Sequence, residues 1–160
     1  MNPISIGCAV PDFELPSTGT NPFRLTDCRG QLVVLYFYPK DNTPGCTQEA
    51  QAFRDDFTQF NALNTVLVGV SRDSLRVHEG FKTKQALPFE LLADTEESLC
   101  HLFDVIKQKS MYGKQVRGIE RSTFILNTEG VLVREWRKVK VKGHSSEVLQ
   151  VLRELTGISA

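Results

Sequence analysis

Leu32-Val-Val-Leu-Tyr-Phe-Tyr38 is followed directly by Pro39-Lys-Asp-Asn-Thr-Pro-Gly-Cys46, and these two segments decide the fold. The first is a run of β-branched and aromatic residues without polar alternation, which predicts a strand buried on both faces. The second is rich in turn residues. After it, the apolar residues between Ala50 and Phe60 recur at the spacing of one helical face. The stretch therefore predicts a buried strand, a tight loop and a helix.

The rest of the chain alternates predicted strands and helices and then ends in a hairpin and a helix. Apolar runs at 65–71 and 87–94 predict two more strands, and Asp73 or Ser74 is the expected N-cap of a helix that reaches about Gln85. This order predicts an α/β fold with a central mixed β-sheet and helices on both faces. The remaining expected elements are a helix on Leu99, Leu102, Phe103 and Ile106, a hairpin of 123–127 and 131–136, and a final helix on Val148, Leu149, Val151, Leu152 and Leu155.

Length and composition describe one ordinary globular domain, which we place at residues 1–160. The 19 Lys and Arg residues balance the 19 Asp and Glu residues, so no overall field attracts nucleic acid or an anionic membrane. The sequence shows no signal segment or membrane-spanning run, and we expect a cytoplasmic protein with neither kind of partner. The basic stretch 134–142 alternates valine with lysine, which indicates an exposed edge strand.

Cys46 occupies the position where this strand-loop-helix unit favours reactivity. With Thr43 as N-cap and Pro44 at the first helical position, the thiol lies in the first turn of the helix. There, unpaired backbone N–H groups and the helix dipole favour an anion. A free cysteine is also a common small core residue. We expect Cys46 to lie away from the phenylalanine face of the helix, and from these features alone a reactive and a structural role are evenly balanced.

The segment Tyr36-Phe-Tyr-Pro-Lys-Asp-Asn-Thr-Pro-Gly-Cys-Thr-Gln-Glu-Ala50 resembles the peroxidatic motif of peroxiredoxins, in which a proline, a threonine and the reactive cysteine recur at the spacing of Pro39, Thr43 and Cys46. Shorter stretches at 11–13, 69–74, 111–114 and 118–124 resemble the Q-type branch, the bacterioferritin comigratory proteins. The resemblance covers nearly the whole chain. It implies a thioredoxin-like fold, a thiol peroxidase acting on hydrogen peroxide and organic hydroperoxides, and no metal or bound organic cofactor.

The resemblance also implies the roles of individual residues. The Cys46 thiolate would attack one peroxide oxygen, which gives a sulfenic acid and releases water or an alcohol. Arg121 matches the family's active-site arginine, Thr43 would offer its hydroxyl to the thiolate or the peroxide, and Pro39 would shield the sulfur from water. Each has an ordinary alternative, respectively a solvated charge, a helix cap and the end of a strand. Glu49 could pair with this arginine, but acidic residues are common at helix starts, and we assign it no role.

The chain departs from the branch in its second cysteine. Peroxiredoxins of this branch commonly carry a resolving cysteine at the position of Gln51 or in the next helix, where residues 78–85 contain none. We therefore expect a one-cysteine cycle, in which an external thiol such as glutathione, a glutaredoxin or thioredoxin reduces the sulfenic acid. Cys8, Cys28 and Cys100 remain as unconventional resolving candidates, and we expect Cys100 to be buried.

Two other functions stay open. A thiol-bearing binding or holdase-like module would use Cys46 only to sense oxidants, and it would stop after one equivalent of peroxide. A thioredoxin-like disulfide reductase is disfavoured because the chain has no C-x-x-C pair. The three histidines show no ligand spacing that would predict a zinc site. We expect a monomer, with a weak dimer as the alternative.

Overall fold

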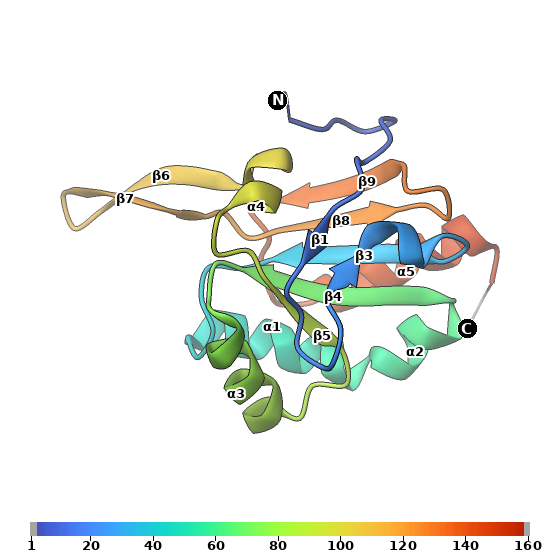
Figure 1. The fold of residues 1–160 in the computed structure, drawn as a ribbon, viewed down its shortest axis with the longest axis horizontal. Coiled ribbons are helices and arrows are strands. Elements are labelled where there is room, and N and C mark those ends of the chain that lie inside the picture. Colours follow the sequence, from blue (N-terminus) through green and yellow to red (C-terminus); the bar gives the residue numbers. More distant parts are fainter. Residues whose placement is uncertain (1–2, 159–160) are drawn as a thin grey trace.

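A five-stranded mixed sheet forms the centre of the molecule in the computed structural model, which describes residues 3–158 (Figure 1). The strand order is β5-β4-β3-β8-β9. β3 runs parallel to β4, and β4 runs parallel to β5, whereas β8 pairs antiparallel with both β3 and β9. The strands of this sheet are β3 (Leu32–Phe37), β4 (Thr65–Ser71), β5 (Glu90–Ala93), β8 (Ser122–Leu126) and β9 (Leu132–Arg137).

β3 is central to the sheet because each of its residues is buried. Successive side chains point to opposite faces, so the alternating residues of this strand enter two separate apolar clusters. Val34 and Tyr36 pack in one cluster, and Val33, Leu35 and Phe37 pack in the other. The apolar run without polar alternation therefore reflects burial on both faces, as the sequence predicts.

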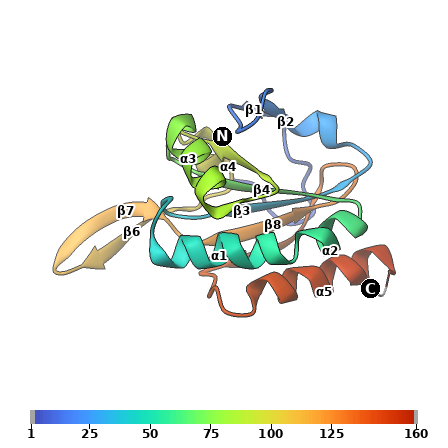
Figure 2. The same cartoon turned by 90° about the horizontal axis from the view of Figure 1, so that it is seen from below.

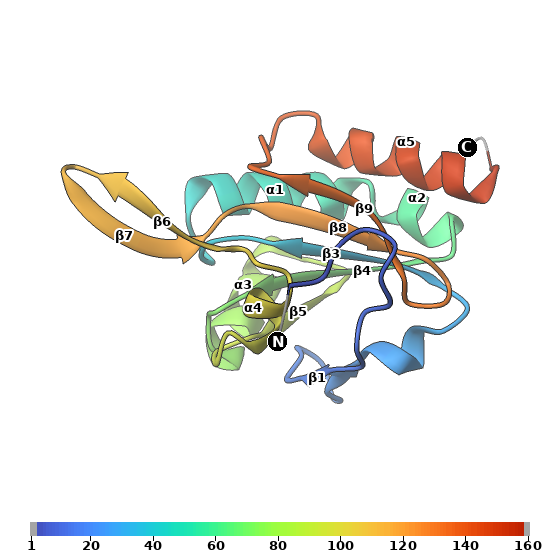
Figure 3. The ribbon, with the colours of Figure 1, turned by 90° about the horizontal axis from the view of Figure 1, so that it is seen from above.

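Helices cover both faces of the sheet, which confirms the predicted α/β architecture. The helices α1, α2 and α5 lie along one face (Figures 2 and 3), and their residues Phe53, Phe60 and Leu152 join the cluster of Tyr36. α4 and the 3-10 helix η1 pack on the other face through Leu99 and Leu25. The helices are η1 (Leu25–Cys28), α1 (Pro44–Asp55), α2 (Phe57–Ala62), α3 (Leu75–Gln85), α4 (Ser98–Leu102) and α5 (His144–Thr156).

The boundaries of several elements differ from the sequence prediction. The helix expected through Phe60 is divided at Asp56, whose backbone (φ −97°, ψ 2°) leaves the helical region and whose carboxylate accepts a hydrogen bond from Ser145 of α5. The expected helix that includes Ile106 is wrong in its second half. α4 ends at Leu102, because Asp104 adopts a left-handed conformation (φ 53°) that turns the chain into a new strand.

A hairpin between residues 106 and 119 was not predicted at all. β6 (Ile106–Met111) and β7 (Lys114–Ile119) pair with each other and project from the body (Figure 1). Most of their residues are exposed, so neither strand shows the alternation that a half-buried strand would. The reversal is a two-residue loop, Tyr112 and Gly113, both at positive φ (52° and 77°), as a tight hairpin turn requires.

β9 lies at the edge of the main sheet, which confirms the edge position expected for the start of the basic stretch. The strand ends at Arg137, so the expected extension through residue 142 is wrong. Two short strands, β1 (Glu14–Leu15) and β2 (Phe23–Arg24), form a separate pair before η1. Among residues 3–158, no helix is both long and apolar enough to cross a bilayer.

Close packing around β4 predicts a large effect of Gly69→Ala. A Cβ at this position would lie 2.8 Å from Cζ of Tyr36 and 2.9 Å from Cδ2 of Leu91, inside the main core. We expect the substitution to lower the free energy of unfolding by about 1–3 kcal/mol, measured by urea denaturation. Gly80→Ala on α3 is the control, because nothing lies within 4 Å of its Cβ, and it should stabilise the helix by about 0.5–1 kcal/mol. Equal stability of the two variants would contradict this account.

Candidate active site

The sulfur of Cys46 lies at the start of α1, as predicted. Thr43 is the N-cap, with an extended backbone (φ −98°, ψ 153°), and Pro44 begins the helix. α1 follows the carboxyl end of β3, the usual place for a site in an open α/β sheet (Figure 2). The side chain of Thr43 does not cap the helix within the described chain; its hydroxyl donates to the carbonyl oxygen of Lys40 at 2.7 Å. The N–H groups of the first turn are thus left to stabilise an anion.

Arg121 brings a positive charge to this sulfur from a distant part of the chain. It lies between β7 and β8, and its Nη2 donates to Sγ of Cys46 at 3.5 Å while its Nη1 donates to Oε1 of Glu49 at 2.8 Å. Burial by itself lowers the pKa of the guanidinium, but the negative charges of Glu49 and the Cys46 thiolate outweigh it and raise the pKa. Arg121 is therefore a permanent cation that bridges two residues one turn apart on α1.

Glu49, to which the sequence analysis assigned no role, is the carboxylate that contacts Arg121 beside the sulfur. Its carboxylate is 2% exposed, and its Oε2 has no hydrogen-bond partner among the described residues. Burial raises the pKa of this carboxyl to about 7, although the charge and hydrogen bond of Arg121 oppose the rise. The available signal was its spacing, because a residue one turn beyond Cys46 lies on the same side of the helix.

Cys46 is buried more deeply than expected. It is 2% exposed and packs in the same apolar cluster as Ala50 and Phe53. The expectation that it avoids the phenylalanine face is wrong, because positions 46, 50 and 53 are spaced by a helical turn and share one face of α1. Its neighbours Thr43 and Arg121 are only half-buried.

Gly45 allows the guanidinium to approach the sulfur. A Cβ on this residue would lie only 3.0 Å from Nη2 of Arg121, closer than side chains normally pack. The close approach of the arginine thus explains the glycine at this position. Pro39 is exposed at the start of the loop between β3 and α1. Its shielding of the sulfur stays a prediction.

The other three cysteines lie apart from Cys46, two of them on the opposite face of the sheet and one on the exposed N-terminal segment. Cys28 and Cys100 belong to the cluster on the opposite face, whereas Cys46 belongs to the cluster of α1. Burial raises the pKa of both the Cys28 and the Cys100 thiols, which keeps them protonated. Cys8 is exposed near the N-terminus, and its sulfur lies 3.4 Å from Oγ of Ser5. The structure brings none of the three into contact with Cys46.

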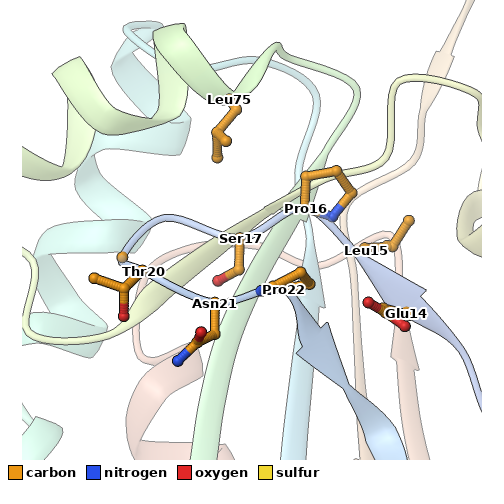
Figure 4. A pocket seen from close by; sticks show the side chains of 9 residues that line it. Glu14, Leu15, Pro16, Ser17, Thr20, Asn21, Pro22 and Leu75 are labelled. Atoms are coloured by element: carbon orange, nitrogen blue, oxygen red, sulfur yellow. The ribbon is translucent and has the colours of Figure 1, made fainter.

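A hollow of about 520 Å³ lies elsewhere on the molecule, between the segment from Glu14 to Pro22 and the start of α3 (Figure 4). Figure 4 shows Leu75 of α3 on one side of it and Pro16 and Pro22 on the other. Its lining includes none of the residues around Cys46. The candidate site is therefore at the amino end of α1 and does not include this hollow.

Comparison with known proteins identifies the family. Residues 6–135 match the model of the AhpC/TSA family. Peroxiredoxin Bcp of Bacillus subtilis is 51% identical over 96% of this chain and 98% of the relative. Peroxiredoxin Bcp of Xanthomonas campestris is 47% identical over 94% of each chain. Both relatives align along nearly their whole length.

Solved structures agree with this assignment. A structure of the bacterioferritin comigratory protein of Xanthomonas campestris superposes with a TM-score of 0.86 at 47% identity, over 90% of this chain and 92% of that one. A cysteine-to-serine mutant of Xylella fastidiosa PrxQ gives a TM-score of 0.91 at 42% identity, over 97% and 99% of the two chains. Because the family model matches most of the chain and these relatives match nearly all of it, the chain belongs to the AhpC/TSA family and, within it, to the Bcp peroxiredoxins, which are thiol-dependent peroxidases.

Proposed function

We propose that this chain reduces hydrogen peroxide and organic hydroperoxides at Cys46 through a sulfenic acid. The contact between Nη2 of Arg121 and Sγ of Cys46, at the amino end of α1, carries the proposal. The thiolate attacks one peroxide oxygen, an S–O bond forms and the O–O bond breaks. The departing oxygen keeps the bonding electrons and takes up a proton to become water or an alcohol. The sulfur is oxidised by two electrons to the sulfenic acid.

Thiolate formation alone contributes only part of the rate. At an ordinary thiol pKa of about 8.5, full ionisation at neutral pH accelerates the reaction by at most about 30-fold. Stabilisation of the negative charge that develops on the departing oxygen is the larger effect, and donors fixed before the reaction provide it without reorganisation. Arg121 suits this role because it is held by Glu49 at 2.8 Å and retains a second N–H edge toward the sulfur.

Thr43 has the geometry of an acceptor toward the peroxide. Because its hydroxyl proton is committed to the carbonyl of Lys40, the oxygen lone pairs remain available. A hydroperoxide can then donate its O–H to Thr43 and accept from Arg121, which directs its O–O bond relative to Cys46. Pro39, at the start of the same loop, would restrict water near the sulfur. The Xanthomonas campestris relative, whose structure concerns alkyl peroxide reduction, supports organic hydroperoxides as substrates.

The recycling step uses an external thiol in this proposal. Cys28 and Cys100 lie on the opposite face of the sheet from Cys46, which disfavours a disulfide with either one. Gln51, where the branch commonly has a resolving cysteine, donates instead to Oε1 of Gln85 at 2.9 Å and ties α1 to α3. A small thiol such as glutathione, or a protein thiol of thioredoxin or a glutaredoxin, would therefore reduce the sulfenic acid.

Substitution at the charged contact tests the first step. Cys46→Ser should abolish peroxide consumption, and Arg121→Ala should lower the second-order rate at least about tenfold, because the departing oxygen loses its cation. Thr43→Val should act in the same direction. Stopped-flow measurements of the folded variants provide the rates. Arg117→Ala, which removes a neighbouring arginine paired with Glu97, is the control and should react normally. A normal rate for Arg121→Ala would remove the cation from the mechanism.

Trapping of the oxidised state tests the second step. After one equivalent of peroxide we expect a sulfenic acid at Cys46, captured by dimedone and located by mass spectrometry, with Cys8, Cys28 and Cys100 still free. Added thiol should then support many turnovers. An intramolecular disulfide to any of the three would contradict the one-cysteine cycle. Consumption that stops after one equivalent in the presence of every thiol tested would favour the oxidant-sensing alternative.

The raised pKa of Glu49 predicts a specific dependence of stability on pH. The carboxyl titrates near 7 when folded and near 4.5 when unfolded, so the folded state binds more protons between these values and its stability falls as pH rises. Replacement by Gln removes this titration. The free energy of unfolding of Glu49→Gln, minus that of the wild type, should therefore increase by up to about 3 kcal/mol from pH 4.5 to above pH 7. Urea denaturation at several pH values checks this, and parallel curves would contradict it.

A further inference from the structure

A buried polar network joins the active-site loop to three strands and α3. Asp41, in the loop between β3 and α1, is 2% exposed and is held at three points. Its Oδ1 accepts from the hydroxyl of Tyr38 at 2.5 Å, and its Oδ2 lies 2.6 Å from Nδ1 of His78. Its backbone N–H donates to Oδ2 of Asp73 at 2.9 Å, and the same oxygen accepts from Ser71 at 2.6 Å. Both the carboxylate and the backbone N–H of Asp41 therefore hold the loop in place.

His78 is the residue that connects this loop to the far strand. It lies on α3 and is fully buried. Its Nε2 lies 2.9 Å from the carbonyl oxygen of Leu92 on β5. A carbonyl only accepts, so this nitrogen carries a hydrogen, while Nδ1 faces the carboxylate of Asp41 within hydrogen-bond distance. The imidazole thus connects the edge strand β5 to the loop through its two ring nitrogens.

The network controls the loop that orients the reacting groups. Asn42, directly after Asp41, has a left-handed backbone (φ 64°), so the chain reverses there before it reaches Thr43 and the first turn of α1. Tyr38, Ser71 and Leu92 lie at the carboxyl ends of the parallel strands β3, β4 and β5 or directly beyond them. Any shift of Asp41 is therefore transmitted to Thr43 and to the entry of the helix that carries Cys46.

We propose that His78 is a positioning residue for the peroxide reaction, acting through Asp41 to hold Thr43 and the amino end of α1 against the Cys46 sulfur and Arg121. The proposal rests on the proposed function of this site and assigns no contact between His78 and the substrate. Loss of the imidazole leaves a buried carboxylate with one partner fewer. The loop then turns toward water to solvate Asp41, and the reacting groups lose their alignment.

Asp41→Asn separates this geometric role from an effect of charge. The asparagine amide can donate to Nδ1 of a neutral His78, whose Nε2–H still donates to Leu92, while its oxygen still accepts from Tyr38. The substitution therefore removes the negative charge and retains the three contacts. If His78 acts by positioning, Asp41→Asn should stay within about threefold of the wild-type rate, whereas His78→Ala should lose about 10- to 100-fold.

A set of four variants tests the proposal by stopped-flow peroxide kinetics and hydrogen exchange of the loop. His78→Ala should slow the second-order reaction and speed amide exchange in residues 39–47. Tyr38→Phe, which removes only the hydroxyl from Oδ1 of Asp41, should show the same two changes to a smaller extent, and it serves if His78→Ala does not fold. Asp94→Asn is the stability control. It alters another fully buried carboxylate, which accepts from the backbone N–H of Cys100 at 2.7 Å, and it should change neither readout.

The outcomes separate this proposal from the proposed function. A folded His78→Ala protein with the wild-type rate and wild-type exchange would overturn it. A rate for Asp41→Asn as low as that of His78→Ala would also overturn it. The same holds if Asp94→Asn has the stability of His78→Ala and reacts as slowly. If the wild-type chain fails to consume peroxide, the proposed function is lost and the role of His78 in that reaction with it, whereas faster exchange of the loop in His78→Ala would still show that His78 holds the loop in place.

Discussion

The bridge from Arg121 to Cys46 and Glu49 is the interaction on which the site depends. One guanidinium edge lies 2.8 Å from the carboxylate and the other 3.5 Å from the sulfur. Both partners are buried on the same helix, whereas the arginine comes from the segment between β7 and β8. A cation that is 17% exposed and held by a buried acid cannot swing freely into solvent. In the proposed reaction it presents a fixed positive charge where the thiolate forms and where the negatively charged oxygen departs.

The central sheet determines which cysteines can reach Cys46. Because successive residues of β3 face opposite sides, the molecule has two apolar clusters, with Cys46 in one and Cys28 and Cys100 in the other. Thiols that lie on opposite faces of a sheet cannot form a disulfide without opening the fold. Gln51, where the branch commonly has a resolving cysteine, instead donates to Gln85 and ties α1 to α3. Separation across the sheet thus favours an external reductant.

Much of the fold could be predicted from the sequence because buried elements have recognisable patterns of apolar residues. The runs of β3 and β4 are apolar without alternation, and the order of strands and helices after them indicated a mixed sheet with helices on both faces. The hairpin β6–β7 has no such pattern, since most of its residues are exposed and its stability comes from pairing and a two-residue turn. The ends of helices were also misjudged, because Asp56 and Asp104 interrupt them through backbone conformations that apolar spacing does not encode.

The sequence by itself determined the strand-loop-helix unit, the N-cap at Thr43 and the place of Cys46 in the first turn of α1, because these depend on neighbouring residues and local propensity. It also pointed to Arg121, but only through resemblance to a family. The tertiary structure alone decided that Glu49 faces this arginine and that His78 reaches Asp41. Each of these contacts joins segments or faces whose orientation depends on how helices pack on the sheet, and such packing is a property of the whole fold.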